Sequence, residues 1–246
     1  MKSSNDLYQR VTVVTGASRG LGRGIASALV ANGARVIGIA RSTGDLVTIT
    51  GDAADEVLAA RVVREQQPTG IVVCAGAAPV LGAFHEQTWE EFSTNWNVDT
   101  KSAFVWLKAA LRDPLPPGSH VIVVSSGAAV QGSPLSGGYA GAKRTQWMLA
   151  EYAATEAKRA GLDLRVHVLL PNLNPSTDLG RAGIAGYATR AGVPIDEFQK
   201  RFLPPVTPEV MGSVVVALLT RPADHGELAY RVMGKGLVSL AEKPNG

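Results

Sequence analysis

Short runs of apolar and β-branched residues alternate along this chain with segments of helical periodicity, and this alternation restricts the possible folds more than any other feature. The run Val121-Ile122-Val123-Val124 is apolar at every position, as expected of a strand covered on both faces within a parallel sheet. Strands are predicted at residues 11–15, 35–40, 47–50, 71–74, 121–125, 164–170 and 228–232. Helices are predicted at residues 20–31, 53–66, 88–111, 139–160 and 208–219. The pattern predicts an α/β fold: a doubly wound, parallel seven-stranded sheet with helices on both faces.

Two connections between these elements have unusual lengths. Residues 41–46 join the second and third strands and are too few for a crossover helix. Residues 172–206 form a long connection with several Gly and Pro, and they follow the carboxyl end of a strand, where α/β proteins bind ligands. We therefore predict one domain over residues 1–246, with residues 172–206 as a substrate lid; an ordinary surface insertion is the alternative.

Composition argues against several classes of protein. Of 246 residues, 46% are hydrophobic and 18% charged, and the net charge of +3 includes no run of Lys or Arg, so no nucleic-acid partner is expected. No segment reaches the roughly 18 uninterrupted apolar residues of a membrane span, and the first six residues lack the apolar stretch of a secretory signal. The single cysteine, Cys74, fits a reducing compartment. We expect a cytoplasmic protein without a membrane partner.

The first predicted strand runs into a glycine-rich turn and then a helix. The turn reads Gly16-Ala17-Ser18-Arg19-Gly20-Leu21-Gly22. Glycine permits tight turns and close approach of the backbone to a ligand, and the helix N-terminus offers free N–H groups to a pyrophosphate. The spacing differs from the common dinucleotide fingerprint. A plain tight turn is the alternative, but a position on the first strand of an α/β chain favours a dinucleotide site.

The end of the second predicted strand bears on which nicotinamide cofactor the chain prefers. An acidic residue there would bind the ribose 2′-hydroxyl of NAD(H) and repel a 2′-phosphate. The chain instead has Ala40 followed by Arg41, and Arg19 lies in the glycine-rich turn. Guanidinium groups are good phosphate ligands, so we predict that NADP(H) is preferred over NAD(H). Two solvated surface arginines are the alternative.

Tyr139 and Lys143 lie four residues apart, on one face of a predicted helix, and Ser126 lies thirteen residues before Tyr139. A nearby ammonium group favours the phenolate and lowers the pKa of a tyrosine, which suits it for general acid–base catalysis. An isolated Tyr-x-x-x-Lys is more often a packed tyrosine beside a solvated lysine. The catalytic interpretation therefore depends on the rest of the chain.

Together these residues resemble the short-chain dehydrogenase/reductase family, and the resemblance covers essentially the whole chain. The elements in family order are Thr15-Gly-Ala-Ser-Arg-Gly-Leu-Gly22, Asp52, Ala75-Gly76, Asn97, Ser126, Tyr139-x-x-x-Lys143 and Pro171. The TGxxxGxG pattern and the YxxxK spacing match members that act on carbonyls and alcohols, rather than the enoyl reductases. The resemblance implies a Rossmann-type NAD(P)-binding domain that assembles as a homodimer or homotetramer.

The resemblance also implies roles for individual residues. Tyr139 would exchange a proton with the substrate oxygen, Lys143 would lower the pKa of Tyr139 and hold the nicotinamide ribose, and Ser126 would hydrogen-bond the substrate oxygen. Asn97 would seat a water that links Lys143 to solvent. Asp52 would contact the adenine, with N-capping of the helix after the third strand as the alternative. The implied cofactor-binding residues are Gly16, Ser18, Arg19, Gly20, Leu21, Gly22, Arg41, Asp52, Ala53, Ala75, Gly76, Tyr139, Lys143, Pro171 and Asn172.

These features predict an NADPH-dependent oxidoreductase that interconverts a carbonyl and a secondary alcohol on a small-molecule substrate. The alternatives are an NAD-dependent alcohol dehydrogenase of the same fold and a non-catalytic NADP(H)-binding regulatory protein.

The chain departs from the family pattern at two places. Val73-Cys74 replaces a pair of asparagines, and Cys74 is expected to be a small buried residue without a basic neighbour. Asn172 follows Pro171 where the family has glycine, which leaves open whether Ser176 or Thr177 contacts the nicotinamide carboxamide.

Other polar residues have weaker signals. The four histidines show no metal-ligand spacing, so no metal site is expected, and His85 is either a surface residue or a substrate contact. Tyr187, Arg181 and Arg190 lie in the predicted lid, where they either select an anionic or polar substrate or lie on the surface.

Overall fold

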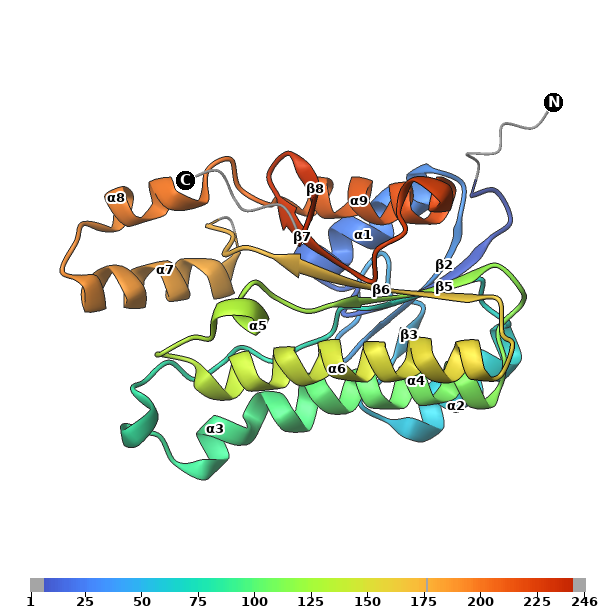
Figure 1. Ribbon diagram of the computed structural model, residues 1–246, viewed down its shortest axis with the longest axis horizontal. Coiled ribbons are helices and arrows are strands. Elements are labelled where there is room, and N and C mark those ends of the chain that lie inside the picture. Colours follow the sequence, from blue (N-terminus) through green and yellow to red (C-terminus); the bar gives the residue numbers. More distant parts are fainter. Residues whose placement is uncertain (1–6, 176, 241–246) are drawn as a thin grey trace.

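One eight-stranded sheet organises the computed structural model, which describes residues 7–175 and 177–240 (Figure 1). The strands are β1 (Val11–Thr15), β2 (Arg35–Ala40), β3 (Ile49–Thr50), β4 (Gly70–Val73), β5 (Ser119–Val124), β6 (Leu164–Pro171), β7 (Ala229–Met233) and β8 (Gly236–Ser239). Their order across the sheet is β3-β2-β1-β4-β5-β6-β7-β8. The first seven pair in parallel, and β8 pairs antiparallel with β7. The predicted doubly wound α/β fold is confirmed.

The predicted number of seven strands is wrong, because β8 was not recognised. It follows β7 after a tight hairpin turn in which Met233 pairs with Gly236. Gly236 has φ +116, a conformation that only glycine adopts readily. The strand has four residues and no buried one, so it lacks the apolar run on which the other strands were predicted.

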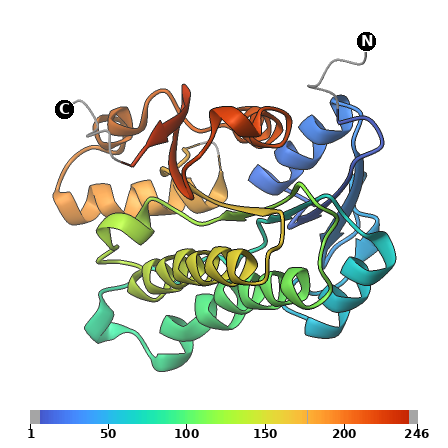
Figure 2. The ribbon, with the colours of Figure 1, turned by 45° about the vertical axis from the view of Figure 1, so that its right-hand side comes forward.

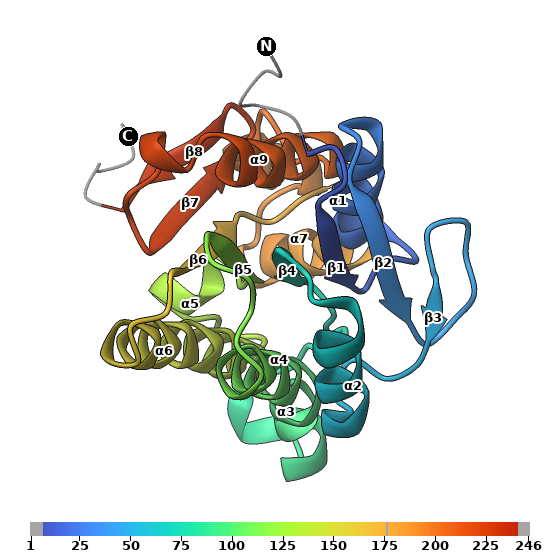
Figure 3. The same cartoon turned by 90° about the vertical axis from the view of Figure 1, so that its right-hand side faces the viewer.

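Helices cover both faces of the sheet (Figures 2 and 3). On one face lie α1 (Gly20–Ala31) and α9 (Pro208–Thr220), and on the other lie α2 (Glu56–Gln66), α4 (Lys101–Arg112) and α6 (Gly137–Arg159). Side chains of successive strand residues point to opposite faces, so Val13 packs with α2 and α4, whereas Val14 packs with α1 and α9. Both faces are therefore buried, which explains the uninterrupted apolar runs of the central strands.

The predicted helix at residues 88–111 is in fact two helices. They are α3 (Trp89–Asn95) and α4, separated by a π-helical turn, η2 (Trp96–Thr100). Thr88 caps α3 in a reciprocal capping box with Glu91. A π-turn inserts one extra residue into a helix and changes the direction in which the side chains after it point. The inserted turn brings Asp99 against the active-site helix α6, as described below.

Residues 172–206, expected to be a lid, contain helices that the sequence did not reveal. These are α7 (Asp178–Ala191), α8 (Ile195–Gln199) and the 3-10 turn η3 (Lys200–Phe202). They lie together beyond one end of the sheet (Figure 1). The segment has its own small core of Ile184, Ala188 and Phe198. Short elements complete the structure: α5 (Ala128–Gln131), η1 (Phe84–Glu86) and η4 (Pro222–Asp224).

Strand order reverses between β1 and β4, since the chain runs from β1 outward to β3 and then returns to β4. In doubly wound sheets, the carboxyl ends of the strands at such a point form a ligand-binding crevice. No helix within the described residues has the length and apolarity needed to cross a bilayer.

Candidate active site

A cavity of about 1210 Å³ lies at the carboxyl ends of the strands. The predicted site residues line it with one exception, Asn97. They come from the turn after β1, the ends of β2, β4, β5 and β6, the connection before α2, and the first turns of α6. The predicted residues that line the cavity are Gly16, Ser18, Arg19, Gly20, Leu21, Gly22, Arg41, Asp52, Ala53, Ala75, Gly76, Ser126, Tyr139, Lys143, Pro171 and Asn172.

The glycine-rich turn after β1 has no room for side chains at two positions. Gly16 has φ +74, and a Cβ atom there would lie 3.0 Å from the Cα atom of Ala75. A Cβ atom at Gly22 would lie 2.2 Å from the carbonyl oxygen of Gly16. Thr15 Oγ1 accepts hydrogen bonds from the backbone N–H groups of Cys74 and Ala75, both at 3.0 Å, and so joins the ends of β1 and β4.

The N-terminus of α1 borders the cavity without a side-chain cap and without an acidic residue in its first turn. The first N–H groups of a helix have no partner within the helix, and they attract phosphate groups. The residues present therefore fit the pyrophosphate of a dinucleotide.

Arg19 and Arg41 are both exposed at this end of the cavity. Among the described residues, neither forms an ion pair. Asp45, the acid in the connection after β2, is paired with Arg23 at 2.8 Å and does not line the cavity. Two cationic side chains are thus available to a phosphate group.

Asp52 lines the cavity, but it does not cap α2. Its carboxylate accepts a hydrogen bond from Ala54 N at 2.9 Å. The N-cap of α2 is Asp55, whose side chain accepts from the N–H groups of Val57 and Leu58. The capping role considered for Asp52 is therefore wrong, because the helix begins one turn later than the sequence suggested.

Ser126, Tyr139 and Lys143 line the same cavity, and both Ser126 and Lys143 lie close enough to act on the Tyr139 hydroxyl. Ser126 follows β5, and Tyr139 and Lys143 project from the first two turns of α6. The Lys143 ammonium lies 5.6 Å from the centre of the Tyr139 ring. This part of α6 approaches α3 closely, since a Cβ atom at Gly138 would lie 1.9 Å from the carbonyl oxygen of Phe92.

Burial raises the pKa of Tyr139 above the ordinary value of 10.0. The Lys143 charge and a hydrogen bond from Ser126 favour the phenolate and counteract burial only in part. Lys143 thus acts on the pKa of Tyr139 in the predicted direction. The net pKa of Tyr139 is nevertheless above its ordinary value, and not below it as predicted. The physical reason is that the phenolate loses more free energy of hydration on burial than one nearby ammonium group gives back.

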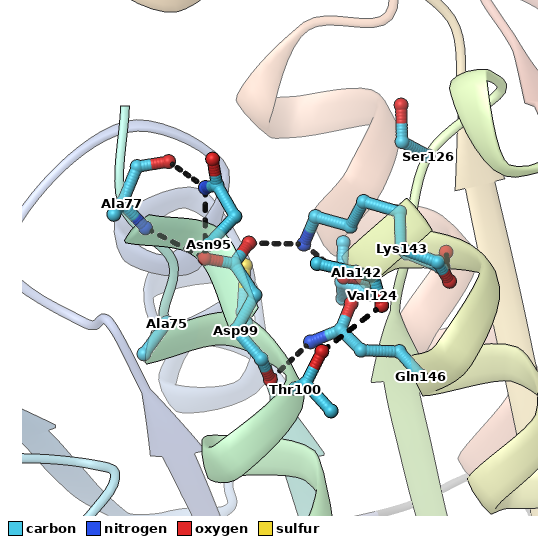
Figure 4. A network of polar contacts seen from close by, with 12 residues as sticks. Ala75, Ala77, Asn95, Asp99, Thr100, Val124, Ser126, Ala142, Lys143 and Gln146 are labelled. Atoms are coloured by element: carbon cyan, nitrogen blue, oxygen red, sulfur yellow. Dashed lines mark hydrogen bonds and ion pairs between the residues drawn. The ribbon is translucent and has the colours of Figure 1, made fainter. Parts of the chain in front are cut away.

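Lys143 is almost completely buried, yet it is held as a cation (Figure 4). Its Nζ atom forms an ion pair with Asp99 Oδ1 at 3.0 Å and donates to Val124 O at 3.2 Å. Burial acts to lower the pKa of Lys143, but the negative charge of Asp99 and that of Tyr139 in its phenolate form together outweigh burial and raise the pKa above 10.5.

Asn97 is exposed on η2 and does not line the cavity, so the structure gives no support to its predicted catalytic role. The residue that sequence reasoning missed is Asp99, two positions later. A signal was present: Asn95, Asp99 and Ser102 are polar residues at helical spacing among buried positions. A polar residue on the buried side of a helix requires a polar partner.

Cys74 lines the cavity beside β4, and burial raises the pKa of its thiol to about 11. The fold brings Lys143 near enough for its charge to act on the thiol, although no basic residue adjoins Cys74 in sequence. Burial outweighs that charge. Cys74 is therefore protonated at neutral pH, although it is half-buried at the cavity wall and not fully buried as predicted.

The lid segment lines one end of the cavity with several large apolar side chains and with polar residues that include Thr177 and Asp178. Leu173, Leu179, Phe198 and Phe202 line it from the lid, and Leu81 lines it from the connection after β4. The Tyr187 hydroxyl also reaches this end and is hydrogen-bonded to the Ser133 hydroxyl, which links the lid to the loop before α6.

The other polar residues considered for this end lie elsewhere. Arg181 forms an ion pair with Asp178, and Arg190 is exposed; neither arginine lines the cavity. His85 is an exposed residue of η1 outside the cavity lining. Ser176 lies outside the described residues.

Thr177 and Asn172 line the cavity at the place considered for the nicotinamide carboxamide. The Thr177 hydroxyl is the N-cap of α7, since it accepts from Gly180 N at 3.1 Å, and it also donates to Asn174 O. Asn172 Nδ2 donates to Met233 Sδ at 3.2 Å. No cluster of three or more His, Cys, Asp or Glu side chains arranged to hold a metal occurs in residues 7–175 and 177–240.

Comparison with known proteins agrees with this geometry. The family model described as short chain dehydrogenase matches residues 10–182. Carbonyl reductase [NADPH] 2 of Sus scrofa is 29% identical over 157 residues, which are 58% of this chain and 64% of that enzyme. The match therefore spans less than two thirds of the pig enzyme. A short-chain dehydrogenase/reductase of Armillaria gallica is 26% identical over 200 residues, 72% of this chain and 77% of that protein.

Solved structures show the same fold at lower identity. A candidate NAD(P)-dependent gluconate 5-dehydrogenase of Beutenbergia cavernae, with NADP bound at low occupancy, superposes with a TM-score of 0.80 at 23% identity and covers 94% of this chain and 98% of that one. A short chain dehydrogenase family protein of Francisella tularensis has a TM-score of 0.77 at 20% identity, with 92% and 98% of the two chains covered. The family match over most of the chain and the residues gathered at the cavity lead to one conclusion: the protein belongs to the short-chain dehydrogenase/reductase family of NAD(P)-binding oxidoreductases.

Proposed function

We propose that this protein is an NADPH-dependent oxidoreductase that interconverts a carbonyl and a secondary alcohol, with Tyr139 as the general acid and base. The observation that carries the proposal is the convergence of Ser126, Tyr139 and Lys143 on the cavity that also contains the glycine-rich turn. Groups that bind a dinucleotide and groups that transfer a proton thus border one space.

Binding of NADP(H) is proposed from the residues at the cofactor end. The uncapped N-terminus of α1 and the turn at Gly16 and Gly22 would hold the pyrophosphate, and Arg19 and Arg41 would bind the 2′-phosphate. A relative is named as an NADPH-dependent carbonyl reductase, and a structure with the same fold contains NADP. When bound, NADP(H) supplies or accepts the hydride.

The side chains of the chain itself would handle the proton. In the reducing direction, Ser126 holds the substrate oxygen and the Tyr139 phenol donates its proton to that oxygen. The Lys143 ammonium, 5.6 Å from the ring centre, stabilises the phenolate that remains. In the oxidising direction, the phenolate removes the alcohol proton.

The lid end of the cavity supports a neutral, largely apolar carbonyl substrate. Its wall includes Leu179, Phe198 and Phe202, and none of the three arginines in residues 172–206 lines it. An anionic substrate would have to lose its hydration there without a cationic partner, which is costly. We infer that residues 172–206 act as a lid that selects such substrates.

Turnover of NADPH with a panel of ketones, keto-esters, sugars and acyl thioesters tests this proposal. We expect neutral apolar ketones to be reduced best. Tyr139→Phe should lower turnover by about 10²-fold or more while the affinity for NADPH, measured by fluorescence titration, stays within about twofold.

The exposed Tyr8, replaced as Tyr8→Phe, is the matched control and should leave both quantities unchanged. Full activity of Tyr139→Phe would disprove the catalytic assignment. Binding of NADPH without turnover of any compound would favour the regulatory NADP(H)-binding alternative, and tighter binding of NADH would favour the NAD-dependent one.

A homo-oligomer is proposed as well. Phe104, Met148 and Tyr152 are exposed on α4 and α6, and such side chains on neighbouring helices support an interface between copies of the chain. Light scattering of the purified protein measures its mass; a monomer at micromolar concentration would contradict the proposal.

A further inference from the structure

We propose that Asp99 is a positioning residue of the active site: its carboxylate fixes the Lys143 ammonium and keeps Tyr139 in the phenol form, so the site favours proton donation to a carbonyl. This inference rests on the proposed function and specifies how that function is regulated by charge.

The Asp99 carboxylate is surrounded by donors (Figure 4). Oδ1 lies 3.0 Å from Lys143 Nζ, and Oδ2 accepts from Ala77 N at 2.9 Å and from Asn95 Nδ2 at 3.1 Å. The residue has no exposed surface. The carboxylate therefore lies in direct contact with the Lys143 ammonium and is held there by two further N–H donors.

The protein is built closely around this carboxylate. A Cβ atom at Gly76 would lie 2.7 Å from Asp99 Oδ1, so a larger residue could not occupy that position without displacing the ion pair. The backbone oxygen of Asp99 accepts from Gln146 Nε2 at 2.7 Å, and both residues are fully buried. Because Gln146 lies one turn after Lys143 on α6, this bond ties η2 to the helix that carries the catalytic pair.

The contacts determine how the ammonium group of Lys143 is directed. An ammonium has three N–H donors; Val124 O accepts one of them, and the ion pair with Asp99 directs the charged group toward η2. A further donor is left for the cavity, which Lys143 lines together with Tyr139. Asp99 therefore orients Lys143 without itself touching the reacting atoms.

Charged and titratable groups from four elements face Tyr139. Lys143 on α6 and the Ser126 hydroxyl after β5 favour its phenolate, whereas Asp99 on η2 and Cys74 after β4 oppose it, and burial opposes it most. Asp99 Oδ1 is 3.0 Å from Lys143 Nζ, which is 5.6 Å from the ring centre, so the carboxylate lies within about 9 Å of the ring. At an effective dielectric constant near 20, a unit charge at that distance changes a pKa by about one unit, or about tenfold in the ionisation constant.

The test compares Asp99→Asn with the wild-type protein, and uses Glu56→Gln as a matched loss of a carboxylate in an exposed ion pair with Lys108. Alcohol oxidation requires the phenolate, and carbonyl reduction requires the phenol. We expect the pH profiles of both directions to move about one unit lower in Asp99→Asn and to stay in place in Glu56→Gln. Equal losses of both rates at every pH, without a shift, would mean that Asp99 is merely structural and would overturn the proposal.

A second measurement needs no turnover. The tyrosinate absorbance of wild type minus that of Tyr139→Phe, recorded in stopped-flow pH jumps, reports ionisation of Tyr139 alone. We expect the wild-type transition above the ordinary tyrosine pKa of about 10 and about one unit lower in Asp99→Asn.

A wild-type transition at or below the ordinary value would refute the proposal, even if Asp99→Asn did not fold. If the titration shifts as expected while no substrate is turned over, the proposed enzymatic function fails and the electrostatic role of Asp99 stands.

Discussion

His120 and His167 form a buried pair on β5 and β6 that should make the fold sensitive to acid. Their rings stack with centres 5.7 Å apart, and the side chains are 1% and 4% exposed. Burial lowers the pKa of His120 from 6.5 to about 3, with smaller contributions from His167, Arg165 and Arg10. Burial also lowers the pKa of His167. The His120 ring is thus neutral in the folded protein at pH 5 to 7.

The sign of the effect follows from proton linkage. Below pH 6.5 the unfolded chain binds a proton at His120 that the folded protein does not bind, so the free energy of unfolding falls as the pH falls and levels off near pH 3. At pH 5 the loss from His120 alone is about 2 kcal/mol, and near pH 3 it approaches about 5 kcal/mol. This is a large fraction of the roughly 5–15 kcal/mol that stabilises a typical domain.

Urea unfolding followed by circular dichroism at pH 7.5 and pH 5 measures this loss. His120→Phe keeps an aromatic ring against His167 but cannot be protonated, so we expect it to lose about 2 kcal/mol less than wild type between the two pH values. His85→Gln, at an exposed histidine, should behave as wild type does. An equal loss in wild type and His120→Phe would show that His120 is not held neutral by burial.

Three further predictions concern the cavity and its supports. Arg41→Asp should weaken NADPH binding about 10- to 100-fold, because it removes a charge-assisted phosphate contact. NADH binding should change little. An NADPH affinity equal to that of wild type in a fluorescence titration would contradict the NADP(H) preference. Gly138→Ala places a Cβ atom 1.9 Å from the carbonyl oxygen of Phe92 and should lower the free energy of unfolding in urea by about 2 kcal/mol. Gly226→Ala, whose Cβ atom would have no neighbour within 4 Å, should not lower it. Similar urea midpoints for the two variants would argue against the close contact of α6 with α3. Cys74, with a thiol pKa of about 11, should react with iodoacetamide at pH 8 roughly 100-fold more slowly than free cysteine, as followed by mass spectrometry; alkylation at the rate of the free thiol would refute the burial argument.

Much of the fold could be predicted from local patterns. The elements β1, β2 and α1 have the predicted bounds, because an apolar run, a glycine turn and a helical period follow one another without ambiguity. Helix α9 begins at Pro208, as predicted, because Thr207 as the N-cap and a proline at the first helical position form a signal within two adjacent residues. The motifs that line the cavity could also be predicted, because their residues follow the carboxyl ends of recognisable strands.

Elements of the structure without a local signal in the sequence were not predicted. Strand β8 has no buried residue, and α7 is rich in glycine, so neither shows the apolar periodicity of its type. The π-turn η2 lies within a continuous helical pattern, so the sequence did not reveal that Asn97 is exposed and that Asp99 contacts Lys143.

The amino-acid sequence by itself determined the family, the order of β1 to β7 with the main helices between them, and the spacing of Ser126, Tyr139 and Lys143. Only the tertiary structure decided that Asp99 is the partner of Lys143 and that burial raises the pKa of Tyr139. The physical reason is that ionisation depends on desolvation and on charges at close range. Both are set by the packing of η2, β4 and β5 around α6, elements that lie far apart in the chain.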